Sequence, residues 1–344
     1  MRIDYTPQLD FKDVLIRPKR TTISSRSQVS LERKFTFPNT KTTWSGVPII
    51  AANMDTTGTF EVYDILSQFK MITCFHKHYT VEDFKTRGRL TLNPDYFMIS
   101  TGIGDSSLLK LRELVDYTDA KWICIDVANG YMNSVVKYAS KVREMFPDKI
   151  IVAGNVASKE MVEEFIINGK VDVVKIGIGP GSACLTRRKT GVGVPQLSAI
   201  IECADGAHGV NGCIVGDGGI TSPGDLAKAF GGGADFVMIG GQFAGHDENP
   251  GELEEKDGKK YKLFYGMSSE HAMKKHYGQM ASYRSSEGRV IRVPYKGPLK
   301  ITVQDYLGGL RSTCAYINAH TIKNIPKCTT FLTVGQQLNT HFEK

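Results

Sequence analysis

The stretch KIIVAGNVASKEMVEEFIINGKVDVVKIGIG, residues 149–179, contains a complete strand–helix–strand unit. Its outer segments, KIIVAGNV and VDVVKIGIG, are apolar runs with little alternation, which is typical of strands buried on both faces of a parallel sheet. The segment between them, KEMVEEFIINGK, places Met161, Phe165 and Ile166 on one side of a helix that ends near Gly169. This stretch therefore predicts two parallel strands joined by a helical crossover.

Six more runs of the same kind flank this unit: VPIIAANMD, MITCFHKH, YFMISTGIG, KWICIDVANG, GCIVGDGG and ADFVMIGG. Successive runs lie 22 to 27 residues apart, which is enough chain for a strand, two loops and a helix, except for one step of 41 residues after the sixth run. The segment SPGDLAKAFGGG begins with a Ser-Pro helix entry and stops at glycines. Eight such units predict an α/β fold, a (β/α)8 TIM barrel formed by one domain over residues 1–344. A doubly wound open sheet is the alternative.

Two long connections interrupt this repeat. The first is the step after strand six, and the second is an insertion after strand eight, residues 246–298. Within the insertion, ELEEKDGKKYKLF predicts a hairpin that turns at Asp257-Gly258. The polar segment SYRSSEGR, residues 282–289, predicts a mobile flap over the barrel mouth. TVQDYLGGLRSTCAYI, residues 302–317, is expected to be the helix that closes the barrel.

Composition and charge narrow the function classes. The chain has 344 residues, of which 41% are hydrophobic and 23% charged, with a net charge of +7; this is typical of a globular domain. The basic residues are scattered, so no nucleic-acid partner is predicted, whereas small anionic ligands such as nucleotides fit well. The N-terminal segment lacks the apolar core of a signal peptide, and no apolar run is long enough for a membrane span. Seven cysteines without metal-site spacing indicate free thiols and a cytoplasmic location.

Cys184 occupies an unusual setting for a structural cysteine. In KIGIGPGSACLTRRKTGVGVPQ, residues 175–196, it follows Gly181 and Ser182 and precedes Thr186 and Arg187. Such surroundings favour a thiolate, whereas structural cysteines sit among apolar neighbours. An inert thiol is the alternative, but the end of strand six is where barrel chemistry gathers. The same loop can turn carbonyl oxygens toward a hard cation. Four other cysteines in apolar or helical surroundings are expected to be inert: Cys74, Cys124, Cys203 and Cys213.

Glycine pairs end strands seven and eight, in GDGGI (216–220) and IGGQFAG (239–245). Loops at these two positions of a barrel often bind phosphate through backbone N–H groups, so we predict a phosphate site there rather than simple tight turns. Asp217 suits a ribose hydroxyl, with a helix N-cap as the alternative. The motif HKH, residues 76–78, has no third ligand at suitable spacing, so Lys77 is the more interesting group, as a partner for a carboxylate or a cofactor phosphate. The chain has no GxGxxG after its first strand and hence no support for a Rossmann cofactor site.

The motifs together resemble the GMP reductases of the IMP dehydrogenase/GMP reductase family, from about Phe11 to the end of the chain. They are DFKDVLIRPKR, IIAANMDTTGTF, HKHY, CIDVANGY, GIGPGSACLTR, KTGVGVPQLSA, AFGGGADFVMIGG, FYGMSSE and YRSSEG. Single motifs such as GxGPGSxCxTR are shared with IMP dehydrogenases. Those enzymes typically insert a pair of CBS motifs where His78 to Tyr96 leaves room for one crossover. Their flap carries an Arg-Tyr pair where this chain has Glu287.

The resemblance implies purine nucleotide interconversion: GMP and NADPH give IMP, ammonia and NADP. The Cys184 thiolate is expected to attack purine C2 and form a covalent thioimidate as ammonia leaves, after which NADPH delivers hydride to the same carbon. Thr186 and Glu287 match the family's proton-transfer pair for the departing amine. Dividing one hard substitution into two steps is what covalent catalysis offers.

The resemblance also implies binding residues and a homotetramer. The substrate residues are Asp217, Gly218, Gly219, Gly240, Gly241, Met267, Ser268, Arg284 and Gly288. The NADPH residues are Lys77, Asp126, Val127, Ala128, Gly179 and Tyr283, together with Ser25, Arg26, Ser312, Thr313, Cys314 and Ala315 reaching the cofactor of a neighbouring subunit or their own. The backbone ligands of a monovalent cation, expected to be potassium (K+), are Gly179, Gly181, Cys184 and Arg187.

Three positions depart from the family pattern. Ala183 and Leu185 stand in GSACLTR where relatives commonly read GSVCTTR, and Gly216 stands where they commonly have serine. Loss of that hydroxyl is expected to weaken nucleotide contacts. Two other functions remain open: an IMP dehydrogenase without CBS motifs, and a barrel that binds purine nucleotides without catalysis. The intact Cys184, Thr186 and Glu287 argue against the second.

Overall fold

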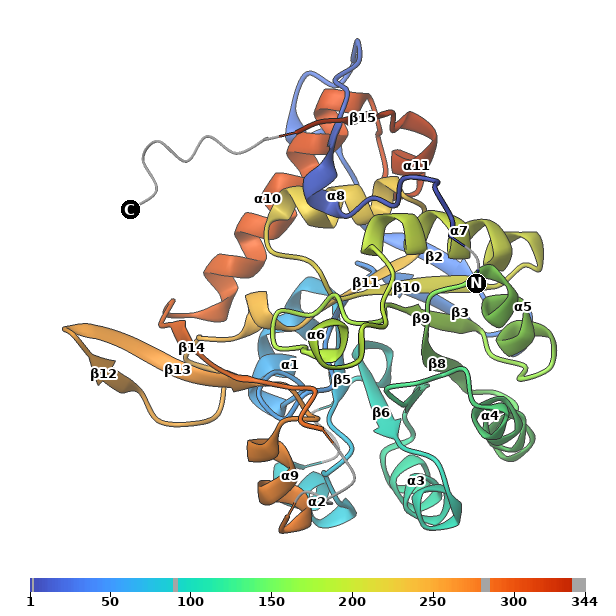
Figure 1. The fold of residues 1–344 in the computed structure, drawn as a ribbon, viewed down its shortest axis with the longest axis vertical. Coiled ribbons are helices and arrows are strands. Elements are labelled where there is room, and N and C mark those ends of the chain that lie inside the picture. The colour runs from blue at the N-terminus through green and yellow to red at the C-terminus, as the bar shows by residue number, and fades with distance from the viewer. Residues whose placement is uncertain (2, 89–91, 280–284, 336–344) are drawn as a thin grey trace.

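Eight parallel strands form a closed barrel in the computed structural model, which describes residues 1, 3–88, 92–279 and 285–335 (Figure 1). The strands are β4 (Ile49–Ala51), β5 (Ile72–Phe75), β6 (Phe97–Thr101), β7 (Trp122–Asp126), β8 (Ile150–Val156), β9 (Val173–Ile176), β10 (Cys213–Asp217) and β11 (Phe236–Ile239). β11 pairs with β4, with Val237 opposite Ile49, so the sheet has no open edge. The predicted TIM barrel is confirmed, and the open-sheet alternative is wrong.

Helices connect the strands and cover the outside of the barrel (Figure 1). They are α1 (Phe60–Leu66), α2 (Val81–Arg87), α3 (Asp105–Thr118), α4 (Asn133–Met145), α5 (Lys159–Ile167), α6 (Thr186–Thr190), α7 (Gln196–Gly209), α8 (Pro223–Gly231), α9 (Glu270–Tyr277), α10 (Leu299–Ile317) and α11 (Ile325–Cys328). α8 begins as predicted, because the Ser222 side chain accepts a hydrogen bond from the Asp225 N–H and Pro223 occupies the first helical position. Within the described ranges, no helix combines the length and hydrophobicity that crossing a membrane requires.

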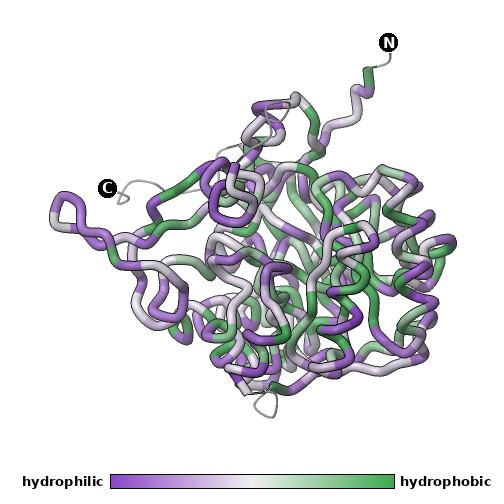
Figure 2. The backbone as a smooth tube through the Cα atoms, turned by 90° about the horizontal axis from the view of Figure 1, so that it is seen from below, coloured by the Kyte–Doolittle hydropathy of each residue, from purple (hydrophilic) through white to green (hydrophobic). Residues whose placement is uncertain are grey.

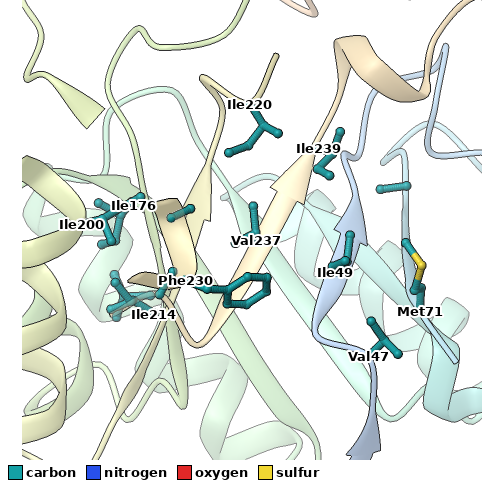
Figure 3. Packing of buried hydrophobic residues seen from close by; sticks show 14 of the residues in the cluster. Val47, Ile49, Met71, Ile176, Ile200, Ile214, Ile220, Phe230, Val237 and Ile239 are labelled. Atoms are coloured by element: carbon teal, nitrogen blue, oxygen red, sulfur yellow. The ribbon is translucent and has the colours of Figure 1, made fainter. Parts of the chain in front are cut away.

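The main core lies between the strands and these helices (Figure 3). Ile214 of β10 and Val237 of β11 point outward to the apolar side chains of Ile200 on α7 and Phe230 on α8. Alternate residues of a strand face opposite sides, so the residues between them point into the barrel. Both faces of each strand are therefore buried, which explains the continuous apolar runs in the sequence.

An aromatic plug fills the N-terminal end of the barrel. It comes from the hairpin of β2 (Arg33–Thr36) and β3 (Thr43–Gly46), which the sequence analysis did not predict. The ring of Phe35 stacks on Phe236 at the start of β11 with centroids 4.5 Å apart, and Trp44 meets Trp122 at the start of β7 edge-on at 5.7 Å. This end of the barrel is consequently closed by apolar packing, and the opposite end is free to hold a site.

The insertion after strand eight forms its own small sheet. β12 (Glu254–Lys256) and β13 (Lys259–Tyr265) make the predicted hairpin, and Asp257 and Gly258 have the positive φ angles, 53° and 70°, of a type I′ turn. β14 (Val290–Pro294) adds a third strand, which was not predicted. The hydrophilic tip of this hairpin projects away from the barrel (Figure 2). β1 (Val14–Ile16) and β15 (Phe331–Thr333) pair near the two ends of the chain.

Candidate active site

A large cavity opens at the C-terminal ends of the barrel strands. Its volume is about 2250 Å³, and residues at or just after the ends of all eight strands contribute to its wall. One small molecule typically occupies a pocket of roughly 300–1,000 Å³. This cavity therefore has room for two nucleotide-sized ligands side by side.

Three side chains meet at the wall of this cavity. The loop after β9 carries Cys184, and α6 begins two residues later at Thr186. The Cys184 Sγ lies 3.2 Å from the Thr186 Oγ1, and this hydroxyl donates a hydrogen bond of 2.6 Å to the Glu287 Oε2. A hydroxyl both donates and accepts, so the threonine can relay a proton between the carboxylate and a group bound beside the thiol.

Backbone contacts fix Glu287 against the cysteine loop. The Leu185 N–H donates to the Glu287 carbonyl at 2.6 Å, and the Arg289 N–H donates to the Ala183 carbonyl at 3.0 Å. The Arg289 guanidinium adds two hydrogen bonds to the Ser182 carbonyl, at 2.8 and 3.0 Å. Residues 285–289 of the predicted flap are thus docked on this loop. Tyr283 and Arg284 lie outside the described residues.

The glycine pairs after β10 and β11 also line the cavity: Gly218, Gly219, Gly240 and Gly241. Gly218 has a φ of 92°, and a Cβ there would lie 3.0 Å from Pro180 Cγ. A Cβ at Gly241 would lie 2.6 Å from Ser182 Oγ. Side chains at these two positions would crowd the protein's own atoms, so the packing of the loops favours glycine there. Bare backbone of this kind is also what phosphate binding through N–H groups uses.

A buried lysine in the wall of the cavity lies between Asp126 of β7 and Asp217 of β10. Lys175 extends from β9 into the barrel and its side chain is only 2% exposed. Its Nζ lies 2.7 Å from the Asp126 Oδ1 and 3.1 Å from the Asp217 Oδ2. The Asn155 amide donates a further hydrogen bond of 2.8 Å to the same Asp217 oxygen. Lys175 was not among the site residues predicted from the sequence, although a lysine inside the apolar run VVKIGIG was a usable signal.

The electrostatics of this group favour its ionised form. Burial alone would lower the pKa of Lys175, but the Asp126 and Asp217 carboxylates outweigh burial and hold it well above its ordinary value. Burial likewise raises the pKa of Asp126, and the Lys175 ammonium more than reverses that effect, so the net pKa lies below its usual range. Lys175 is therefore a cation at neutral pH and has no free base to offer. The carboxylates keep 30% and 20% of their side-chain surface exposed.

The other predicted ligand residues fall into two groups. Those that line the cavity are Lys77, Asp126, Val127, Ala128, Gly179, Asp217, Met267, Ser268 and Gly288. Those that lie elsewhere are Ser25, Arg26, Ser312, Thr313, Cys314 and Ala315. Ser25 and Arg26 begin a 3₁₀ helix that packs against α10 on the outside of the barrel, and Cys314 is fully buried there. Their contact with a cofactor of a neighbouring subunit stays a prediction.

The predicted cation ligands are backbone groups of the cysteine loop and α6. The Gly181 carbonyl accepts a hydrogen bond from the Cys184 N–H at 3.0 Å, and the Arg187 carbonyl accepts one from the Gly191 N–H at 3.1 Å. A carbonyl oxygen has two lone pairs, so each retains an acceptor position. Neutral oxygens of this kind suit a hard cation.

The histidines of HKH face different partners. The His78 ring stacks on His276 of α9 at 3.5 Å, and the His76 ring stacks on Tyr79 at 4.0 Å. Burial, with the neighbouring His276 adding to it, lowers the pKa of His78 to about 3, so this ring is neutral. Across the described residues, no group of three histidine, cysteine or acidic side chains has metal-binding geometry.

α9 and β13 are attached to the barrel by Asp55, a residue that sequence reasoning did not single out. Asp55 follows β4 and is 2% exposed. Its Oδ2 accepts hydrogen bonds from Tyr265, Lys275 and His276, at 2.9, 2.9 and 2.7 Å. The insertion that carries Glu287 is therefore tied to the barrel through a buried carboxylate.

Two further predictions concern the buried cysteines and Gly216. Cys74, Cys124 and Cys203 are fully buried, as their apolar surroundings predicted, and burial raises the pKa of Cys203 to about 12. The expectation for Gly216 is wrong. A Cβ at Gly216 would lie 2.9 Å from Ile200 of α7, so a serine there would face the helix and not a nucleotide.

Comparisons with known proteins show the family of this chain. The model of the IMP dehydrogenase / GMP reductase domain matches residues 8–340. The GMP reductase of Ascaris suum is 55% identical, over 99% of this chain and 97% of its own. Human GMP reductase 2 is 54% identical and the GMP reductase of Citrobacter koseri 55%, each over 99% of both chains. With a barrel, a cysteine loop and a docked carboxylate that carry the motifs of this group, the chain belongs to the IMP dehydrogenase/GMP reductase family.

Proposed function

We propose that this protein reduces GMP to IMP with NADPH and releases ammonia, a reaction of purine nucleotide salvage. The observation that carries the proposal is the Thr186 hydroxyl, which lies between the Cys184 sulfur and the Glu287 carboxylate at the cavity wall. A cavity of about 2250 Å³ supports binding of nucleotide and cofactor together. The relatives named GMP reductase support the choice of substrate.

In the first half-reaction the Cys184 thiolate attacks purine C2, and the C2–N bond to the amino group breaks. The leaving amine needs a proton, and Thr186 and Glu287 deliver it through their 2.6 Å hydrogen bond. The product is a thioimidate between Cys184 and C2. The Asp217 carboxylate accepts a ribose hydroxyl, and the glycine pairs after β10 and β11 hold the phosphate.

In the second half-reaction C2 gains hydride, the C–S bond breaks, and the thiolate returns to Cys184. Bound NADPH supplies this hydride. The residues that orient the cofactor are Lys77, Asp126, Val127, Ala128, Gly179 and Tyr283, with Ser25, Arg26 and residues 312–315 contributed across a homotetramer interface. Backbone carbonyls of Gly179, Gly181, Cys184 and Arg187 hold a potassium ion that orders the cysteine loop.

One assay separates this proposal from its rivals. Purified protein is mixed with GMP and NADPH, and the near-ultraviolet absorbance of NADPH is followed while products are identified by chromatography. We expect absorbance to fall only when GMP is present, with IMP and ammonia formed in equal amounts. A second mixture contains the protein with IMP and NAD. Formation of NADH in that mixture, without NADPH oxidation in the first, would identify an IMP dehydrogenase. GMP binding without either reaction would identify a non-catalytic barrel.

A further inference from the structure

Lys175 has no role in the chemistry above, although it occupies the centre of the site. It reaches from β9 across the barrel interior to Asp126 at the end of β7, and it also contacts Asp217 at the end of β10. The proposed function assigns Asp126 to the cofactor half of the cavity and Asp217 to the substrate half. One ammonium group therefore touches both halves.

We propose that Lys175 is a positioning residue that fixes Asp126 and Asp217 as hydrogen-bond acceptors for the two ligands and keeps the Asp126 carboxylate ionised. This inference rests on the proposed function, which assigns Asp217 to a ribose hydroxyl of GMP and Asp126 to the nicotinamide cofactor. An ionised carboxylate only accepts hydrogen bonds, whereas a protonated one also donates. Both carboxylates line the cavity and keep part of their side-chain surface exposed, while the lysine hydrogen-bonds one oxygen of each.

The charge balance explains why a cation is needed at this position. Two carboxylates lie within 3.1 Å of the same nitrogen and are consequently close to each other. Without the cation, like-charge repulsion would raise the pKa of one carboxyl, which would then take up a proton. That acceptor would become a donor, and its ribose hydroxyl would lose its partner.

Among the residues that the structure describes, few other charges near this position could replace the cation. The titratable groups that interact with Lys175 or its partners are Asp126 and Cys124 on β7, Asp217 on β10, Cys74 on β5 and Lys77 after β5. The two thiols are fully buried, and burial raises the pKa of Cys74 well above its ordinary value. Lys77 acts on Asp126 from the cavity side, but Lys175 is the cation that hydrogen-bonds both carboxylates.

The test replaces Lys175 with methionine, which fills the space of the alkyl chain without charge, and separately with glutamine, which keeps a donor without charge. Dissociation constants for GMP and for NADPH are measured by calorimetry from pH 5 to pH 8 on the full-length protein. We expect both constants to rise roughly tenfold or more near neutral pH, about the effect of one lost charged hydrogen bond. The loss of affinity on acidification should begin at higher pH than in the wild type, because the carboxyl pKa values rise.

Arg143→Met provides the matched control, since it removes a buried guanidinium on α4 that pairs with Asp172, the residue before β9. It is expected to lower the melting temperature and to leave both dissociation constants and their pH dependence unchanged. If Lys175→Met is unfolded, Lys175→Gln and the charge-balanced pair Asp126→Asn/Lys175→Met are measured instead. GMP binding should be weaker in Lys175→Gln, and the pair should bind GMP more tightly than Lys175→Gln, because Asp217 then faces no second carboxylate.

Two results would overturn the inference. The first is a folded Lys175 variant whose two dissociation constants stay within twofold of the wild-type values and whose affinity falls on acidification at the same pH as in the wild type. The second is failure of all three variants to fold, which would make the role of Lys175 structural. A wild-type protein that binds GMP but does not oxidise NADPH would instead refute the proposed function, because the binding measurements need no turnover.

Discussion

The two ends of strand β9 each hold a buried ion pair, and the pairs are built differently. At the N-terminal end Asp172 binds Arg143 of α4 at 2.5 Å, with side chains 0% and 10% exposed. The remaining Arg143 donors go to backbone carbonyls, including those of Lys170 and Lys149. At the C-terminal end, three residues along, Lys175 binds two carboxylates that stay partly open to the cavity. A buried ion pair enclosed by backbone groups stabilises the fold. A buried cation whose carboxylate partners keep exposed side-chain surface can in addition position a ligand.

The same contrast extends to the whole barrel. Aromatic rings from β2, β3, β7 and β11 close its N-terminal end, while glycines, charged groups and a thiol line the other. Substitutions at the mouth should therefore change chemistry with little effect on stability, and substitutions at the plugged end should do the reverse.

The largest expected effect is the loss of turnover in Cys184→Ala. Removing the attacking thiol should cost about four decades or more in kcat, the scale seen when a nucleophile is deleted. GMP binding should stay within a few fold, because the glycine loops and Asp217 hold the ligand. Titration with GMP and an NADPH assay measure the two effects. Cys203→Ala, at a buried thiol in α7, is the control that should keep turnover. Substantial activity in Cys184→Ala would refute the nucleophile assignment.

Glu287→Gln is expected to separate the two half-reactions. GMP reduction should fall by roughly two to four decades, the usual contribution of a general acid or base. Hydride transfer needs positioning and not a proton, so the burst of NADPH formed from IMP and NADP without ammonia should fall much less. Rapid mixing followed by absorbance measures that burst. A mutant that loses the burst as fully as it loses GMP reduction would mean that Glu287 acts in both steps or only holds the docked segment.

At the opposite end, Arg143→Met is expected to destabilise the protein by about 3–5 kcal/mol, because it leaves the buried Asp172 carboxylate unpaired. The free energy of unfolding can be measured in urea. kcat/KM of the folded variant should match the wild type. A change in KM for GMP larger than twofold would show that the two ends of β9 are coupled. It would contradict the division between a structural ion pair at one end and a ligand-positioning one at the other.

The smallest effect concerns His208 and Asp235, also at the plugged end. The hydrogen bond to Asp235 raises the pKa of His208. The charged pair therefore stabilises the fold fully below the unfolded pKa of about 6.5, and this contribution disappears as pH rises through the folded value. The His208 side chain is 48% exposed, so screening limits the effect to under about 1 kcal/mol. Urea unfolding of wild type and His208→Gln at pH 5.5 and 8.5 should show a difference at the lower pH alone.

Local signals made the barrel predictable from the sequence. Each strand is an apolar run that ends in a glycine or a polar residue, so eight units and the position of Cys184 could be counted directly. The orientation of Gly216 was equally accessible, since Asp217 points into the barrel and neighbouring strand residues point to opposite sides. The error there came from following a family pattern instead of this alternation.

The missed features depend on contacts between distant segments. The hairpin of β2 and β3 is an aromatic plug only because Phe236 and Trp122 approach it from far along the chain. Lys175 bridges carboxylates from β7 and β10, strands whose closeness follows from the closed barrel and not from spacing. Asp55 similarly meets three residues of the insertion only after the chain has folded.

The attachment of the insertion has a consequence for heat inactivation. Its apolar contact with the barrel is a small cluster around Ala183, Ala244 and Phe264, while much of the rest of the attachment is polar and includes three hydrogen bonds to Asp55. Segments with few buried apolar contacts open at lower free energy than the core. On warming, Glu287 should therefore leave the cysteine loop while the barrel is still folded. Catalysis would fail reversibly below the temperature at which the molecule melts, and cooling would restore it without refolding the barrel.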